Sequence, residues 1–61
     1  MKEIDPLIRE LDKIRNENNW GYRKLAQDIG VHYQTVFGWF KHGRLSKMSR
    51  KIVKQYLISR L

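Results

Sequence analysis

Residues 22–39 read YRKLAQDIGVHYQTVFGW, and this stretch decides the fold. It holds two groups of apolar residues at helical spacing, one on each side of Gly30. The first group is Leu25, Ala26 and Ile29, and the second is Val36, Trp39 and the following residue Phe40. Glycine readily takes the left-handed conformation that ends a helix. The stretch therefore predicts two short helices joined by a tight turn.

Helix signals continue on both sides of this stretch. Asp5 is a favoured N-cap, Pro6 suits the first helical position, and Ser46 is a favoured N-cap for a last helix. The apolar arc predicted on that last helix comprises Met48, Ile52, Val53, Tyr56 and Leu57. The expected helices run from Asp5-Pro6 to about residue 17, from Gly21 to Gly30, from about His32 to Lys41 with Gly43 as terminator, and from Ser46 to about Arg60. The sequence predicts an all-α fold, a compact bundle of about four helices in a single domain over residues 1–61.

Composition limits what so short a chain can be. The 61 residues include no cysteine, which excludes a disulfide framework and a zinc-thiolate site. No apolar run approaches the roughly 18 residues that cross a bilayer, so no membrane partner is expected. The N-terminal residues lack the apolar stretch of a signal peptide. We therefore expect a cytoplasmic protein.

Charge is distributed unevenly along the chain. The formal net charge is +7, and all six acidic residues lie within residues 1–28 together with six of the thirteen basic ones. Residues 29–61 carry the other seven basic residues and no acidic residue. A surface of one sign attracts a polyanion. The alternative is a solvated basic face that only aids solubility.

The spacing of small and branched residues in the central stretch adds a packing constraint. Two helices joined by a glycine turn approach closely only with a small residue on the first and a compact β-branched residue on the second. Ala26 and Val36 occupy those positions.

Residues 22–39 resemble the helix-turn-helix of the Cro/lambda-repressor-like (XRE) family. The matching pattern consists of Ala26, Gly30, Val31, Val36 and Trp39. The resemblance implies a lambda-repressor-like domain in which Ala26, Gly30, Val36 and Trp39 pack the motif. It also implies double-stranded DNA as the partner, read in the major groove by the helix from about His32 to Lys41. The chain departs from the family pattern at Tyr22, where glutamine is common, and at His32, where serine is common.

One face of the third helix is predicted to read bases. At 100° per residue, Tyr33, Gln34, Phe37, Gly38 and Lys41 point away from the apolar stripe. The amide of Gln34 can bond adenine in a bidentate manner, and Tyr33 and Phe37 suit thymine methyl groups. Gly38 allows the helix backbone to approach DNA closely. The alternatives are an ordinary exposed Gln34, a Phe37 folded onto the core edge and a neutral surface Gly38.

Basic and hydrogen-bonding residues around this face are predicted to hold phosphates. The set is Tyr22, Arg23, His32, Lys41, Arg44, Lys47 and Lys51. A stripe of basic residues is expected to run through the loop and along the last helix, and its members are Lys41, Arg44, Lys47, Arg50, Lys51 and Lys54. A solvated face is the alternative for two or three of them.

The sequence therefore predicts sequence-specific DNA binding, and the resemblance implies a prokaryotic or phage transcriptional regulator such as a repressor. In the second half of the chain no acidic residue or cysteine lies at ligand spacing from His32 or His42, so we expect no enzyme, no metal and no cofactor. One rival is an architectural or recombination-accessory DNA binder; another is a protein-interaction module that uses Tyr33, Phe37, Ile58 and Leu61; RNA binding is the least favoured. Ile58 and Leu61 also predict a weak homodimer, or one that forms on DNA.

Overall fold

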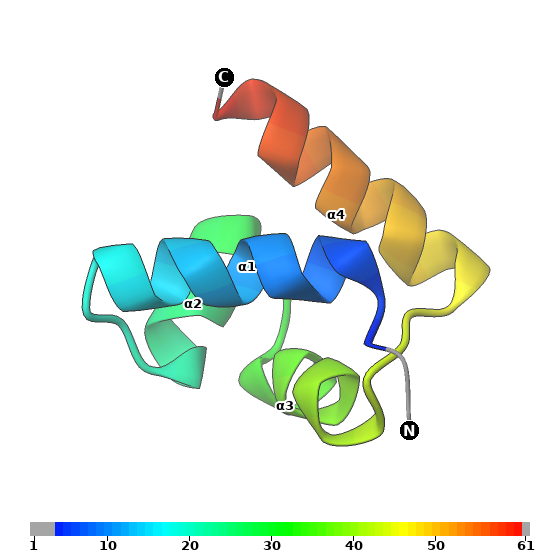
Figure 1. Ribbon diagram of the computed structural model, residues 1–61, viewed down its shortest axis with the longest axis horizontal. Helices are drawn as coiled ribbons and strands as arrows, with labels where there is room; N and C mark the ends of the chain where they lie inside the picture. The colour runs from blue at the N-terminus through cyan, green and yellow to red at the C-terminus, as the bar shows by residue number, and fades with distance from the viewer. Residues whose placement is uncertain (1–3, 61) are drawn as a thin grey trace.

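The computed structural model describes residues 4–60 and contains four α-helices in that range. They are α1 (Pro6–Glu17), α2 (Tyr22–Ile29), α3 (Tyr33–His42) and α4 (Lys47–Ser59). Figure 1 shows them as a bundle in which α3 lies on one side and α4 on the other. The all-α class and all four helices were predicted correctly, with each helix end within two residues of its expected position.

The helices begin and end at the residues that the sequence indicated. Asp5 accepts a hydrogen bond from the Leu7 N–H at 3.0 Å, and Pro6 follows it at the first helical position. Ser46 caps α4 by accepting from the Ser49 N–H at 3.2 Å. Gly30 has a φ of +97°, so the turn between α2 and α3 uses a conformation that a side chain disfavours.

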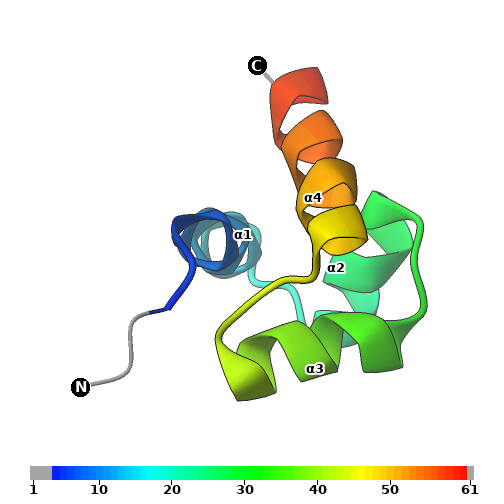
Figure 2. The ribbon, with the colours of Figure 1, turned by 90° about the vertical axis from the view of Figure 1, so that its right-hand side faces the viewer.

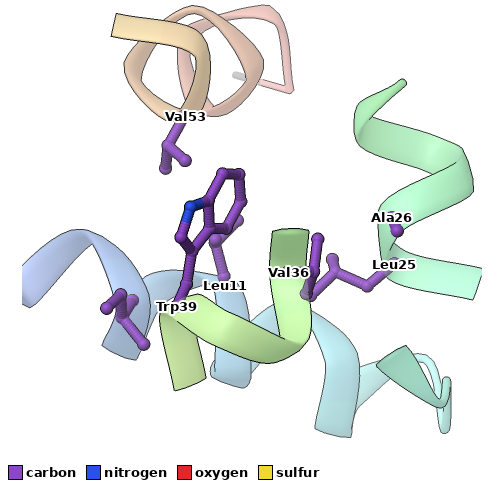
Figure 3. Packing of buried hydrophobic residues seen from close by; sticks show 7 residues of the cluster. Leu11, Leu25, Ala26, Val36, Trp39 and Val53 are labelled. Atoms are coloured by element: carbon purple, nitrogen blue, oxygen red, sulfur yellow. The ribbon is translucent and has the colours of Figure 1, made fainter. Parts of the chain in front are cut away.

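A single cluster of buried residues holds the four helices together. Its members are Ile8, Leu11, Leu25, Ala26, Val36, Trp39 and Val53. Figure 3 shows Val36 pointing at Leu25 and Ala26, and the Trp39 indole extending toward Val53. Ala26 and Val36 lie at the α2–α3 contact, as predicted, and are 1% and 0% exposed.

The outer helix α4 departs from expectation. Its predicted apolar arc is only partly buried, because only Val53 joins the core, while Tyr56 and Leu57 pack at the core edge. Met48 and Ile52 remain 75% and 40% exposed. The reason is geometric: the arc is wider than the strip of α4 that contacts the other helices. A row of apolar side chains is therefore left on the surface.

Figure 2 shows where the exposed parts of the helices lie. α3 runs along the lower edge of the molecule, whereas α4 leads upward and away from it beside the C-terminal end of α2. The outward side of α3 and the outer side of α4 are therefore separate surfaces. Among the four helices described, none is both long and apolar enough to span a bilayer.

Candidate nucleic-acid interface

The outward side of α3 is lined by the side chains predicted to read bases. Tyr33 and Phe37 are 37% and 52% exposed, and Gln34 and Lys41 are exposed as well. Gly38 lies between them and is half-buried. Val36 and Trp39 occupy the opposite side of the same helix, so the predicted division into two faces is correct.

Two exposed residues of α3 were not included in that prediction. Thr35 and His42 are exposed as well. At 100° per residue, both lie on the arc between Gln34 and the buried Trp39, about 100° and about 80° from Gln34. Helical periodicity puts them at the boundary between the two faces, so the spacing alone does not decide whether they are exposed.

The N-terminal end of α3 is capped by an imidazole. The Nδ1 of His32 accepts a hydrogen bond from the Gln34 N–H at 3.2 Å. In the neutral ring this leaves the proton on Nε2, which can donate to a group outside the helix. The ring stacks on Tyr33 with the centroids 4.9 Å apart. His32 thus offers a donor at the positive end of the α3 dipole, where an anion is favoured.

Aromatic contacts fix the first turn of α2 to the side of α3. The guanidinium of Arg23 lies over the Tyr33 ring, 4.6 Å from its centroid. Tyr22 packs edge-on against Phe37, with centroids 5.8 Å apart, and at 5.0 Å against Phe40. These contacts hold the Arg23 charge beside the outward side of α3.

Tyr22 has a different environment from the one expected of a simple phosphate donor. Its ring is half-buried between Phe37 and Phe40, and the Arg15 guanidinium lies 4.8 Å from its centroid. Arg15 also pairs with Asp12 at 2.9 Å. Packing therefore determines the position of Tyr22. Arg15 was missed because no local sequence signal reports a contact between α1 and α2.

Phe37 is both packed against a neighbouring ring and exposed to solvent, so it combines the two predicted environments, an outward-facing aromatic residue and a residue at the core edge. The Phe37 and Tyr22 rings form a T-shaped pair, yet Phe37 is 52% exposed. The contact orients the ring without covering it. An oriented, exposed aromatic side chain next to Gln34 provides an apolar surface on an otherwise polar helix face.

The basic residues from the end of α3 onward divide into one group near α3 and one group on α4. Lys41 and Arg44 form the first group, since they are exposed at the end of α3 and in the loop that follows. Lys47 is the first residue of α4. Lys51 lies one turn further along and lines a hollow with Asp28 and Ile29 at the end of α2. Lys51 is therefore on the outer side of α4, separate from the outward side of α3.

The expected basic stripe is interrupted at Arg50. This guanidinium turns toward the start of α1 and forms an ion pair with Asp5, whose side chain is only 11% exposed. The interruption arises because Asp5 is brought next to α4 by the fold, although 45 residues separate the pair in sequence. The charge of Arg50 is thus partly neutralised within the chain.

Electrostatics favour an anionic ligand at α3. Within residues 4–60, the ion pairs join Asp12 to Arg15, Asp5 to Arg50 and Asp28 to Arg60, and none involves a residue of α3.

No three His, Asp or Glu side chains in the described part of the chain are grouped closely enough to share a metal ion. Of the residues that were expected at a dimer contact, Ile58 is 64% exposed and Leu61 lies outside the described residues.

The chain was compared with models of protein families, with curated proteins and with solved structures, and none of the three comparisons found a match. The candidate interface combines an amide, two exposed aromatic rings and several positive charges on one side of α3 and the adjoining turns.

Proposed function

We propose that the chain binds double-stranded DNA in a sequence-specific manner, with α2 and α3 forming a helix-turn-helix. The observation that carries this proposal is the outward side of α3, where Gln34 is exposed beside the aromatic residues Tyr33 and Phe37. An α-helix fits the major groove of B-form DNA, where each base pair presents a distinct set of groups. A helix that is exposed on one side and packed on the other can be inserted without loss of its core contacts.

The residues on this surface suit two kinds of contact. The Gln34 amide matches the N6 and N7 groups of adenine, and the rings of Tyr33 and Phe37 match thymine methyl groups. Phosphates would be held by Arg23, His32, Lys41 and Arg44, which surround those side chains. The half-buried Gly38 adds no side chain that would keep the helix axis from the bases.

A role in transcription, as a prokaryotic or phage repressor, is supported only by the resemblance of residues 22–39 to the Cro/lambda-repressor-like family. An architectural DNA binder would use the same surface. The two roles differ in what they do to the duplex: an architectural protein bends it at sites of little sequence similarity, whereas a regulator selects a sequence.

The experiment that tests the proposal is selection of bound duplexes from a random pool by the full chain. We expect enrichment of one short block that contains adenine or thymine at the positions facing α3. A pair of blocks about 10 bp apart would indicate two copies bound together. If the bound pool stays random in sequence, specific reading by α3 is wrong.

A second measurement follows from the same selection. The enriched duplex should bind roughly 1,000-fold or more tightly than a random duplex of equal length at the same salt concentration. Equal affinities would leave only the phosphate-binding part of the proposal. A single-stranded RNA of the same sequence serves as the competitor that separates DNA from RNA binding.

A further inference from the structure

A groove lies between the C-terminal end of α2 and the outer side of α4, away from the outward side of α3. Its volume is about 700 Å³, and its apolar wall consists of Ile29, Met48 and Ile52 with the ring of Tyr56. Met48 and Ile52 are four residues apart on α4 and are 75% and 40% exposed. Large apolar side chains gathered in a groove of this kind indicate a binding surface more often than scattered ones do.

Positive charge runs along one edge of this groove. Lys47, Lys51 and Lys54 recur at helical spacing on α4, beside Met48 and Ile52. These lysines line an adjoining hollow that shares Met48 and Lys51 with the groove. No acidic residue among residues 4–60 forms an ion pair with any of the three.

The one carboxylate on the groove is already bound by other residues. Asp28 accepts a hydrogen bond from the Tyr56 hydroxyl at 2.6 Å and pairs with Arg60 at 3.3 Å. It therefore closes one end of the groove without neutralising the lysine row on the other edge. A ligand in the groove meets apolar side chains along its centre and unpaired positive charge along one side.

We propose that this groove binds an acidic amphipathic helix of a partner protein. Met48 to Ser59 provide a wall of about 16 Å along α4, which matches about three turns of a second helix. Apolar residues at helical spacing would pack on Met48 and Ile52, while Glu or Asp on the flank would face Lys47, Lys51 and Lys54.

Charge decides between this partner and the other candidates for the groove. A second copy of the chain carries the same net charge of +7, and its matching groove would bring a second lysine row against the first. A DNA duplex offers phosphates to the lysines but buries neither Met48 nor Ile52. Only a ligand that is both acidic and apolar satisfies both features.

The groove is separate from the surface proposed to bind DNA, so both ligands can be held at once. Figure 2 shows α4 and the end of α2 on the side of the molecule away from α3. The proposal does not depend on DNA binding. Failure of either interaction can be measured while the other remains.

The test uses the full chain and a labelled synthetic peptide of roughly 14 residues, about four helical turns, with leucines on one face and glutamates elsewhere. Controls are a scrambled peptide of the same composition and a peptide with lysine in place of glutamate. Fluorescence anisotropy should show saturable binding of the first peptide and at least about tenfold weaker binding of both controls.

Variants locate the site. Met48→Gln changes a side chain that is 75% exposed and lies outside the buried core, so we expect the fold to be unchanged. We expect Met48→Gln, Ile52→Ser and Lys51→Glu each to weaken peptide binding several-fold to tenfold, with circular dichroism equal to that of the parent. Gln34→Ala, on the outward side of α3, should bind the peptide like the parent.

Three outcomes would overturn the proposal. Equal binding of the scrambled peptide would mean that charge alone attracts it. Sedimentation of the free chain as a dimer that Ile52→Ser dissociates would mean that a second copy fills the groove. Loss of binding to duplex DNA in Met48→Gln, with no effect on the peptide, would assign this surface to nucleic acid.

Discussion

At the scale of single residues, Gly38 is where folding and binding have opposite requirements. It lies in the middle of α3, and a Cβ built on it would meet nothing within 4 Å. Alanine there should therefore stabilise the chain by about 0.5–1 kcal/mol, because glycine is a poor helix former. If the α3 backbone lies close to DNA, the same methyl group should lower duplex affinity. Urea unfolding and anisotropy measured on Gly38→Ala test both effects together.

Gly30→Ala is the matched control for that substitution. A Cβ on Gly30 also meets nothing within 4 Å, but its φ of +97° is strained for any other residue. This variant should be destabilised by about 1–2 kcal/mol from backbone strain alone. A Gly38→Ala chain that is more stable and binds DNA at least as tightly as the parent would remove Gly38 from the proposed DNA surface.

His32 illustrates a role that the sequence could not fix. Serine is the usual residue after such a turn in the Cro/lambda-repressor-like family, and an imidazole has no such obvious capping function. The structure shows that Nδ1 takes the capping role of a hydroxyl oxygen. The same imidazole also stacks on the Tyr33 ring. The capping contact of His32 follows from the orientation of its ring in the fold, which the identity of the residue alone does not give.

At the scale of helices, the boundaries were predictable because their causes are local. Asp5, Ser46 and Gly30 determine helix ends through atoms within a few residues of themselves. The exposure of Met48 and Ile52 was not predictable in the same way. Their helical spacing is that of core residues, and only the position of α4 against α1 and α2 decides which apolar residues are covered.

In the candidate site too, features set within one helix were predictable and features set by contacts between helices were not. The outward positions of Gln34 and Phe37 follow from helical periodicity, which one helix contains within itself. The packing of Tyr22 and the pairing of Arg50 with Asp5 depend on contacts between helices. The surroundings of a charged or aromatic side chain therefore follow from the sequence only where its neighbours are local.

The contact of α4 with α2 through Tyr56 gives a prediction about pH. Burial, followed by the hydrogen bond to Asp28 and its negative charge, raises the pKa of Tyr56 above its ordinary value, and Arg60 offsets part of this. Folding therefore favours the protonated phenol. Its contribution to stability is fully present below about pH 10 and is lost as the pH rises through the higher pKa of the folded chain.

The variant that tests this contact is Tyr56→Phe. At neutral pH we expect it to lower the free energy of unfolding by about 0.5–1 kcal/mol, through loss of one partly exposed hydrogen bond. Above about pH 10 the difference from the parent should shrink. Tyr33→Phe, which changes an exposed phenol on α3, controls for general effects of alkaline pH. A difference between parent and Tyr56→Phe that stays constant up to pH 11 would contradict the proposed linkage.

At the scale of the whole molecule, charge is distributed unevenly along the chain. All six acidic residues precede residue 29, and α3 and the loop after it have none. An uneven charge distribution steers a polyanion to the positive side before short-range contacts form. Exposed positive charge lies at α3 and along α4, so a salt titration of the parent alone cannot say which surface responds.

Three substitutions distinguish the surface at α3 from the surface along α4, and they also distinguish base recognition from phosphate binding. Lys41→Ala removes a charge at the end of α3, Lys51→Ala removes one from the groove beside α4, and Gln34→Ala removes the amide from the base-reading face. All three side chains are exposed, so each variant should retain the parent's circular dichroism. Affinity for the selected duplex and for a random duplex is then measured over a range of salt concentrations.

If Arg23, Lys41 and Arg44 each neutralise one phosphate, log affinity of the parent should fall with log salt at a slope of about −2.7. Lys41→Ala should reduce the magnitude of that slope by up to about 1 and weaken both duplexes alike. Lys51→Ala should leave the slope unchanged, because Lys51 lines the groove with Asp28 and Ile29. Gln34→Ala should keep the parent slope and lose about 1–3 kcal/mol on the selected duplex alone. If Lys51→Ala lowers the slope while Lys41→Ala does not, DNA lies along α4 and the proposed orientation is wrong.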